Sequence, residues 1–336
     1  MSADKRVLVY EKMRPGTAII EQLNAAGLQG DLPFGPTSNM RRGAPLSAKE
    51  FIELAYDYPV VIGASCAKLD RELLSSLPNL RMISKLGIGY DVIDIEAATD
   101  LGIAVTNTPS PVEIKSVAEH AVALMVACAK RLDFYSAERM RSGQWQDYGV
   151  SAISMIGRTV GIIGFGRIGR ETANLLKTWG MRVLIYDIRP TNLPDFVEPV
   201  DLETLLRESD FVSLHLAKEI GMGPVLGAAE IAQIKHGAIV VNTSRGGNID
   251  QDALVEALRA GKLTAAGLDV FAVEPPPVGS GILQVPNTLL TPHLGAVTPE
   301  SETDMDRMAA ENVIRFLNGE LPETLLNPAF VNNRRG

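Results

Sequence analysis

The first part of the chain alternates short apolar runs with segments of helical periodicity. Between residues 6 and 106 the apolar runs read RVLVY, PVVIG, LRMIS and IAVTN, and helical patterns cover residues 17–26, 70–76 and 94–100. Strands separated by segments of helix length are typical of parallel βαβ units. We therefore expect a parallel sheet with packed helices in this part of the chain.

A long helical pattern follows at residues 111–133, PVEIKSVAEHAVALMVACAKRLD. Its apolar face is broad enough to be buried on most sides. Such a helix is a candidate for a crossover between two domains or for contact with a second copy of the chain.

The alternation of strands and helices returns after this helix. The apolar runs are now TVGIIG, RVLIYD, DFVSLHL, GAIVVN, TAAGLDV and NTLLTPH, with a helix predicted over 167–179. They are nearly continuous, as expected for a parallel sheet covered by helices on both faces. A last helix is predicted from about 299 to 318. The sequence therefore predicts two doubly wound α/β domains.

Composition narrows the class of protein. A chain of 336 residues can form two domains, and 46% apolar with 21% charged residues is ordinary for a globular enzyme. A net charge of −8 without a concentrated Lys/Arg run argues against nucleic acid and anionic lipid as partners. The longest apolar stretch, 121–129, is far shorter than the roughly 20 residues of a membrane span.

The N-terminal residues and the cysteines predict a cytoplasmic location. The start, MSADKRVLVYEKM, lacks the long apolar region of a secretory signal. Cys66 and Cys128 lie far apart in apolar surroundings and are interpreted as reduced thiols.

Three glycines interrupt the run VGIIGFGRIGR. Gly164, Gly166 and Gly169 directly follow a predicted strand and open a predicted helix. In this context the first glycine permits a tight turn, the second lets a diphosphate approach the backbone, and the third lets the helix pack closely on the strand. The helix N-terminus then offers N–H groups to the phosphates. We predict a dinucleotide site here, the alternative being a turn that only joins strand to helix.

An acidic residue strengthens this prediction and selects the cofactor. Asp187 ends the next predicted strand, close to the spacing of about 20 residues at which a carboxylate accepts hydrogen bonds from the ribose. A carboxylate there also repels a 2′-phosphate, so NAD is favoured over NADP. Arg189 is the nearby residue that could soften this preference.

Three further polar residues stand just after predicted strands, where open α/β sheets bind their ligands. Arg245 follows AIVVNTS, Glu274 follows AAGLDV, and His293 closes NTLLTPH. A guanidinium can hold a carboxylate at two points, and a histidine can give or take a proton. A glutamate beside the imidazole fixes its tautomer and favours its charged form. With a nicotinamide, this set would transfer a hydride and a proton.

Each of these residues also has a structural interpretation, and spacing alone does not show that the three meet. Of the other histidines, His120 lies in a predicted helix, His215 in a strand and His236 in a polar turn. We interpret those three as structural, and we predict no metal site.

Several segments in fixed order resemble one family, the D-isomer-specific 2-hydroxy acid dehydrogenases, across nearly the whole chain. The matching segments are 85–109 (KLGIGYDVIDIEAATDLGIAVTNTP), 116–126 (SVAEHAVALMV), 161–169 (GIIGFGRIG), 240–254 (VVNTSRGGNIDQDAL), 265–275 (AAGLDVFAVEP) and 291–295 (TPHLG).

The resemblance implies residue roles. Arg245, Glu274 and His293 would be catalytic, with Arg245 also binding substrate. The backbone of Leu86, Gly87, Ile88 and Gly89 would bind the substrate carboxylate. The residues implied to bind the cofactor are Gly164, Phe165, Gly166, Arg167, Ile168, Gly169, Asp187, Thr243, Ser244 and Asp269, the last at the nicotinamide.

The resemblance also implies the domain arrangement. A flavodoxin-like substrate domain would be split into residues 1–107 and 297–330, with a Rossmann domain, 108–296, inserted between them. This explains why the glycine turn begins near the middle of the chain. A homodimer is also expected.

The substrate is expected to be a small unphosphorylated acid such as glyoxylate, hydroxypyruvate or a longer 2-keto acid. Phosphoglycerate-using relatives carry an arginine in the early loop, where residues 63–69 of this chain offer only Lys68 as a cation. The alternative function is an NAD(H)-sensing binding protein, similar to a co-repressor, with the same fold and triad. An S-specific lactate or malate dehydrogenase is disfavoured because those proteins begin with their glycine turn.

Overall fold

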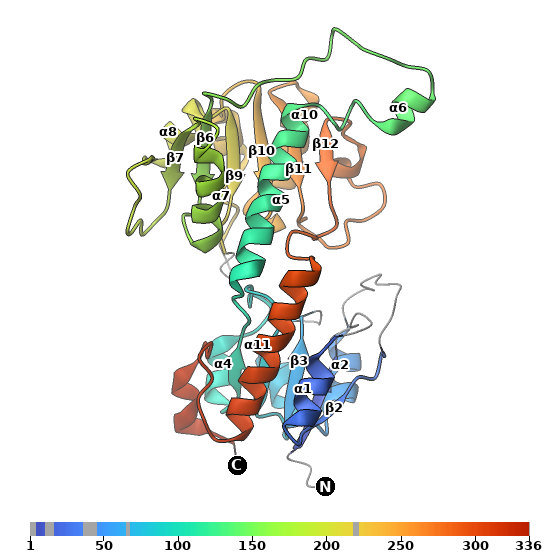
Figure 1. The fold of residues 1–336 in the computed structure, drawn as a ribbon, viewed down its shortest axis with the longest axis vertical. Coiled ribbons are helices and arrows are strands. Elements are labelled where there is room, and N and C mark those ends of the chain that lie inside the picture. The colour runs from blue at the N-terminus through green and yellow to red at the C-terminus, as the bar shows by residue number, and fades with distance from the viewer. Residues whose placement is uncertain (1–4, 11–16, 36–45, 65–67, 218–221, 336) are drawn as a thin grey trace. The chain divides into compact units, whose positions relative to one another are not determined.

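The computed structural model describes residues 5–10, 17–35, 46–64, 68–217 and 222–335. The chain forms two compact units: unit 1 comprises Met1–Glu113 and Val297–Gly336, and unit 2 comprises Ile114–Ala296. Each is a parallel-sheet α/β unit (Figure 1), which confirms the predicted fold class. The first division falls inside the long helix α5 (Pro111–Ala129), whereas the resemblance implies a boundary at residue 107.

Unit 1 is built on a five-stranded sheet in which every strand pair is parallel, in the order β2-β1-β3-β4-β5. This is the flavodoxin-like order. Its strands are β1 (Arg6–Val9), β2 (Gln29–Asp31), β3 (Val60–Gly63), β4 (Met82–Lys85) and β5 (Ala104–Thr106). Its helices are α1 (Ile19–Ala25), α2 (Ala48–Ala55), α3 (Arg71–Ser75), α4 (Ile95–Asp100) and α11 (Pro299–Leu317), and a 3₁₀ helix, η4 (Pro328–Asn333), follows.

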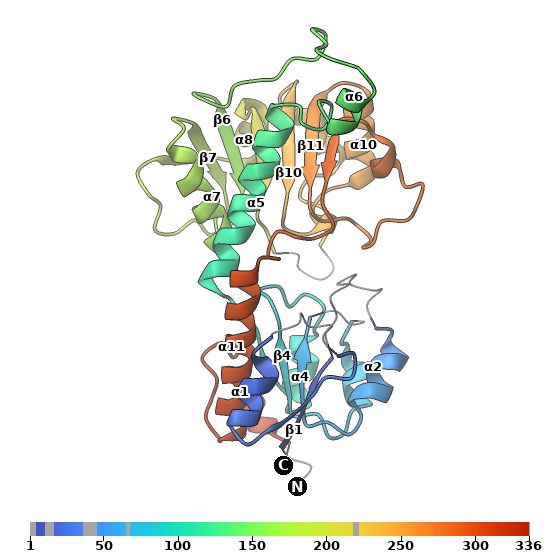
Figure 2. The same ribbon diagram turned by 45° about the vertical axis from the view of Figure 1, so that its right-hand side comes forward.

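Helices cover both faces of this sheet. On one face α1 and α11 lie against the strands (Figure 2). They pack there through buried side chains such as Leu23, Val313 and Phe316. On the other face α2, α3 and α4 contribute Phe51 and Leu74, among others. One face of the unit 1 sheet is therefore covered in part by α11, a helix far from the sheet strands in the sequence.

Unit 2 has a seven-stranded parallel sheet in the order β12-β11-β10-β9-β6-β7-β8. This is the Rossmann order with a seventh strand added at one edge. The strands are β6 (Thr159–Ile163), β7 (Arg182–Tyr186), β8 (Val197–Pro199), β9 (Phe211–Leu214), β10 (Ala238–Asn242), β11 (Leu263–Leu268) and β12 (Thr288–Leu290). The helices besides α5 are α6 (Ala137–Arg141), α7 (Arg167–Lys177), α8 (Leu202–Glu208), α9 (Ala228–Gln233) and α10 (Gln251–Arg259), with 3₁₀ helices η2 (Gly246–Asn248) and η3 (Gly281–Gln284).

The strands at the centre of unit 2 are buried on both sides, as their continuous apolar runs predict. Every residue of β9 and β10 is buried. One face carries α5 and α7, with Leu124 and Leu176 in its core, and the other carries α8, α9 and α10, with Leu205 and Leu254. Since all seven strands run in one direction, their carboxyl ends meet at a single edge.

Short polar side chains start most of the helices that follow strands. Asp70, Asp94, Asp201 and Asp250 each accept a hydrogen bond from a backbone N–H in the first turn of α3, α4, α8 and α10. Such caps satisfy N–H groups that have no partner within the helix. The local sequence therefore fixes where these helices begin.

None of the described helices is long and apolar enough to cross a membrane. Cys128 is a buried free thiol in α5, where burial raises its pKa to about 12. Cys66 lies outside the described residues.

Candidate active site

The glycine turn joins β6 to α7 at the carboxyl edge of the unit 2 sheet. Gly164 has a φ of 92°, and a Cβ there would lie 2.8 Å from backbone atoms of His215. A Cβ on Gly169 would collide with the carbonyl oxygen of Gly164. A Cβ on Gly166, by contrast, would meet nothing within 4 Å. The first and third glycines are therefore required by the protein's own packing, whereas the second faces open space.

The N-terminus of α7 suits an anion. Its N-cap, Gly166, provides no side-chain hydrogen bond, and the first turn holds no acidic residue. Every other α-helix in the described part of the chain has an acidic residue in its first turn. The N–H groups and the positive end of the α7 dipole are thus left for a ligand such as a diphosphate. The open space beside Gly166 fits that group.

Asp187 directly follows β7 and holds the turn from the side. Its carboxylate accepts hydrogen bonds from Phe165 N at 2.7 Å and from Arg189 N at 2.8 Å. Each oxygen of a carboxylate can accept more than one hydrogen bond, so capacity remains for ribose hydroxyls. The N–H of Phe165 is already donated within the protein, so a phosphate ligand would have to bind the neighbouring N–H groups.

The segment after β10 carries Thr243, Ser244 and Arg245. The Ser244 hydroxyl donates to Asn242 Oδ1 at 2.7 Å, whereas the buried Thr243 hydroxyl has no hydrogen-bond partner among the described residues. Arg245 is half-buried, and its Nη1 donates to the Ser244 carbonyl at 2.8 Å. This bond ties the guanidinium to the backbone of its own loop, which follows β10.

The residue after Arg245 brings this loop against the end of β11. A Cβ on Gly246 would collide with the backbone of Phe271, so only glycine permits this approach. Glu274, shortly after Phe271, accepts a hydrogen bond from Phe271 N at 3.0 Å. Burial raises the pKa of Glu274, but the hydrogen bond with His293 and the charges of His293 and Arg245 lower it below its ordinary value. Glu274 is therefore ionised at neutral pH.

His293 and Glu274 form a pair. Nδ1 of His293 lies 2.7 Å from Oε2 of Glu274. An ionised carboxylate only accepts hydrogen bonds, so Nδ1 carries the hydrogen and Nε2 is the nitrogen that remains to exchange a proton. The imidazole is 44% exposed, so Nε2 can reach a ligand. Arg245, Glu274 and His293, which come from three strand ends, are thus brought to one place in unit 2.

The loop that carries His293, residues 291–295, is anchored on Asp269. His293 has a φ of 55°, a left-handed conformation that costs energy in a residue with a Cβ. Its N–H donates to the Asp269 carbonyl at 2.8 Å, and the N–H groups of Leu294 and Gly295 donate to the Asp269 carboxylate at 2.8 Å each. Asp269, which the resemblance implied at the nicotinamide, is buried, and its carboxylate holds this loop.

The electrostatics of Asp269 agree with that role. Burial raises its pKa, but hydrogen bonds from His120, Thr291 and the loop N–H groups lower it below the ordinary value. The carboxylate is therefore charged although it is buried. The resemblance implies a role for Asp269 in cofactor binding, but the sequence does not predict this network.

The expected carboxylate-binding residues, Leu86 to Gly89, lie after β4 in unit 1. Leu86 N donates to Gly63 O at 3.0 Å, Gly87 N to Thr108 Oγ1 at 2.7 Å, and Ile88 N to Glu113 Oε1 at 3.2 Å. Three of the four N–H groups are therefore used within unit 1. Glu113 is buried in the first turn of α5, and its contact with this segment is not predictable from the sequence pattern.

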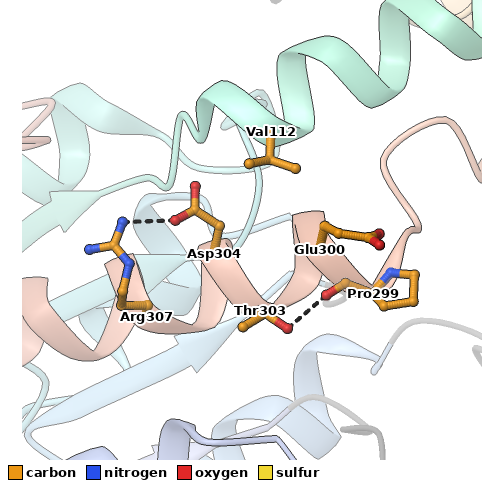
Figure 3. A pocket seen from close by; sticks show the side chains of 6 residues that line it. All are labelled: Val112, Pro299, Glu300, Thr303, Asp304 and Arg307. Carbon is orange, nitrogen blue, oxygen red and sulfur yellow. Dashed lines mark hydrogen bonds and ion pairs between the residues drawn. The ribbon is translucent and has the colours of Figure 1, made fainter.

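A hollow in unit 1 contains none of the predicted site residues. It is lined by Val112, Pro299, Glu300, Thr303, Asp304 and Arg307 (Figure 3). The guanidinium of Arg307 in this hollow already forms ion pairs with Asp304 and with Glu311, at 2.7 Å each. Ser110 also donates to Asp304, at 2.5 Å. These contacts join the chain before α5 to α11, which indicates a structural region.

The remaining histidines differ from one another. His215 is half-buried, its Nε2 lies 2.9 Å from the Ser213 hydroxyl, and burial lowers its pKa to about 3. It is therefore neutral and serves packing. His236 is exposed in its turn. Nε2 of His120 lies 2.9 Å from the Thr291 hydroxyl, at the base of the 291–295 loop.

The described residues include no cluster of three or more His, Cys, Asp or Glu side chains that could hold a metal ion.

Comparisons with known proteins agree with the family resemblance. Residues 122–295 match the family model described as D-isomer specific 2-hydroxyacid dehydrogenase, NAD binding domain. The chain is 37% identical over 330 residues to a glyoxylate reductase of Korarchaeum cryptofilum, covering 96% of this chain and 98% of that protein. It is 38% identical to a hydroxypyruvate reductase of Thermotoga maritima, covering 81% and 89%.

A solved structure supports membership of the same family. A glyoxylate reductase from Paecilomyes thermophila superposes with a TM-score of 0.82 at 30% identity, covering 96% of this chain and 98% of that one.

Proposed function

The chain belongs to the D-isomer-specific 2-hydroxyacid dehydrogenase family, and on this premise we propose that it reduces small unphosphorylated 2-keto acids to D-2-hydroxy acids. It is an NAD-dependent oxidoreductase. The named relatives are reductases, which gives no support to the alternative of an NAD(H)-sensing binding protein. The observation that carries the proposal is the 2.7 Å pair of His293 with an ionised Glu274, whose pKa is lowered in part by the charge of Arg245.

The residues of unit 2 divide the chemistry among them. Arg245 binds the substrate carboxylate and polarises the adjacent carbonyl. His293 donates the proton on Nε2 to the carbonyl oxygen, and Glu274 stabilises the imidazolium before the transfer. NADH, when bound, supplies the hydride that the carbonyl carbon receives. Keto acid, NADH and one proton thus give hydroxy acid and NAD⁺.

Cofactor binding is assigned to the glycine turn and the segment after β10. The α7 N-terminus and residues 164–169 would hold the diphosphate, and Asp187 the ribose. Thr243 and Ser244 would line the nicotinamide side.

The backbone of residues 86–89 would assist Arg245 with the carboxylate. Since Ile88 N donates to Glu113 in this structure, the substrate would replace that bond.

The preference for an unphosphorylated acid rests on the early loop. Lys68 is the one positively charged residue in the sequence of this loop, residues 63–69, and its side chain is exposed. Residues 65–67 lie outside the described part of the chain. Glyoxylate and hydroxypyruvate, which name the relatives, are the first candidates.

A homodimer in the cytoplasm is also proposed. The segment between α5 and β6 extends away from the sheet of unit 2 (Figures 1 and 2). It exposes large apolar side chains, with Trp145 70% and Tyr148 91% accessible. Apolar side chains gathered on one segment favour contact with a second copy.

The function is tested by assaying purified protein with NADH and a panel of 2-keto acids, monitoring absorbance at 340 nm. We expect turnover with glyoxylate or hydroxypyruvate, and little turnover with the phosphorylated keto acid phosphohydroxypyruvate. Absence of turnover on every acid would favour a binding protein, and a preference for phosphohydroxypyruvate would overturn the substrate class.

Asp187 is expected to make the enzyme prefer NADH to NADPH. Its carboxylate accepts from the ribose and repels a 2′-phosphate, and a hydrogen bond to a charged group contributes about 1.5–3 kcal/mol, or roughly tenfold to a hundredfold. Asp187→Ala should reduce the NADH/NADPH ratio of kcat/KM by about tenfold. Equal kcat/KM values for both cofactors in the wild type would show that Arg189 or another neighbour dominates.

Glu274→Gln is expected to move the pH profile of reduction. The lowered pKa of Glu274 keeps its carboxylate charged throughout the neutral range, so this charge is constant there. The charge favours the protonated imidazole that reduction requires. The variant should therefore lose reductive activity at a lower pH than wild type, measured as kcat/KM from pH 5 to 9. An unmoved profile would show that Glu274 does not act on the proton donor.

A further inference from the structure

A second histidine lies behind the loop that carries His293. His120, on α5, has its Nε2 2.9 Å from Thr291 Oγ1 and 3.4 Å from Asp269 Oδ1. The Asp269 side chain is 2% exposed, whereas that of His120 is 23% exposed. A basic side chain at the surface of the unit thus reaches a buried carboxylate.

The hydrogens of this contact can be assigned. Thr291 Oγ1 lies 2.6 Å from Asp269 Oδ1, and because the carboxylate only accepts, the threonine hydroxyl donates its single hydrogen there. The threonine oxygen must then accept from His120. Nε2 of His120 therefore carries a hydrogen and points it at Thr291 and Asp269 together.

The same carboxylate orders the loop. Leu294 N and Gly295 N donate to Asp269, and His293, between Thr291 and these residues, is held in its left-handed conformation. A buried charge is costly unless hydrogen bonds and an opposite charge compensate it. Without the donor on His120, the Asp269 carboxylate would lose one of its compensating contacts, and its hold on the loop would weaken.

We propose that His120 is a positioning residue for the reduction reaction: through Thr291 and Asp269 it holds the 291–295 loop, and with it the His293 imidazole, in the geometry for proton transfer. This role rests on the proposed function of His293. His120 does not itself exchange a proton with the substrate.

The first test compares two substitutions of His120. His120→Leu removes the donor, and His120→Gln retains an N–H donor near the position of Nε2. We expect His120→Leu to lower kcat for keto-acid reduction about tenfold, as for loss of one hydrogen bond to a charged group, with the Kd for NADH within about twofold of wild type. His120→Gln should recover most of the lost kcat. The matched control is His236→Gln, because His236 is an exposed histidine of the same unit.

The second measurement does not depend on turnover. Hydrogen exchange of the Leu294 and Gly295 amides reports opening of the loop, since both N–H groups bond Asp269. In His120→Leu their exchange should be about tenfold faster, and in His120→Gln near wild type. Wild-type exchange in His120→Leu overturns the proposal. Faster exchange with wild-type kcat also overturns it, because the order of the loop would then not affect His293.

A third variant keeps the test valid if His120→Leu does not fold. Thr291→Val removes the hydroxyl and keeps the shape, so it too should speed exchange at Leu294 and Gly295. Wild-type exchange at these two amides in Thr291→Val would contradict the network. If the wild type reduces no keto acid, the proposed function fails, and the exchange rates still test the contact with Asp269.

Discussion

Replacing His293 by alanine is expected to lower kcat by about 10² to 10⁴-fold in both reaction directions, because the reaction loses its acid–base catalyst. Nδ1 is committed to Glu274, and Nε2 is the nitrogen left to exchange the proton. The Kd for NADH, measured by fluorescence titration, should remain near wild type, since the glycine turn and Asp187 lie on other loops. Steady-state kinetics of reduction and oxidation provide the measurement.

Because His293 has a left-handed backbone conformation, a second variant is needed whose side chain tolerates that conformation. At a φ of 55° alanine is strained, whereas asparagine adopts this conformation more readily. His293→Asn therefore removes the imidazole at a smaller cost to the loop, and it should be as inactive as His293→Ala with a higher Tm. Full activity in either variant would mean that the proton donor lies elsewhere.

Arg245→Lys is expected to lower kcat/KM for the keto acid by about a hundredfold, through both a higher KM and a lower kcat. A lysine keeps the charge but loses the planar fork that holds a carboxylate at two points, and charge-assisted hydrogen bonds contribute about 1.5–3 kcal/mol each. The Kd for NADH should change little. Initial rates over a range of keto-acid concentrations separate KM from kcat.

A matched control for Arg245 exists in the same unit. Arg207, on α8, is exposed and paired with Glu203, so Arg207→Lys should leave the kinetics unchanged. If NADH binding collapses in Arg245→Lys but not in this control, Arg245 serves the cofactor or the fold, and its assignment to the substrate is wrong.

The apolar patterns predicted the central strands of both sheets and the edge strands β5 and β12, but not the edge strands β2 and β8. β2 and β8, with the sequences QGD and VEP, lie at the ends of their sheets. An edge strand pairs on one side only and is partly exposed, so its residues need not be apolar. The backbone pairing that defines these strands leaves no hydrophobic pattern in the sequence.

The candidate site was predictable where a residue directly follows a strand. Arg245, Glu274 and His293 could each be selected in this way, but their meeting depends on strand order, which spacing does not reveal. The anchoring of the 291–295 loop was not predicted, because Asp269 and His120 lie far apart in sequence and contact each other only through packing of α5. The hydrogen bond from Ile88 N to Glu113 also depends on the packing of α5, and it was not predicted for the same reason.

The split of unit 1 has a consequence for the order in which the protein is made. α11 covers one face of its sheet, and Asn327 accepts from Val105 N and donates to Ile103 O, each at 2.8 Å, beside the edge strand β5. The ribosome therefore delivers every residue of unit 2 before it delivers the helix and the asparagine that unit 1 needs. A nascent chain that has reached residue 296 contains the strands of both sheets, but the sheet of unit 1 still lacks α11 on one face. The unit whose synthesis starts first is the last to receive all of its parts.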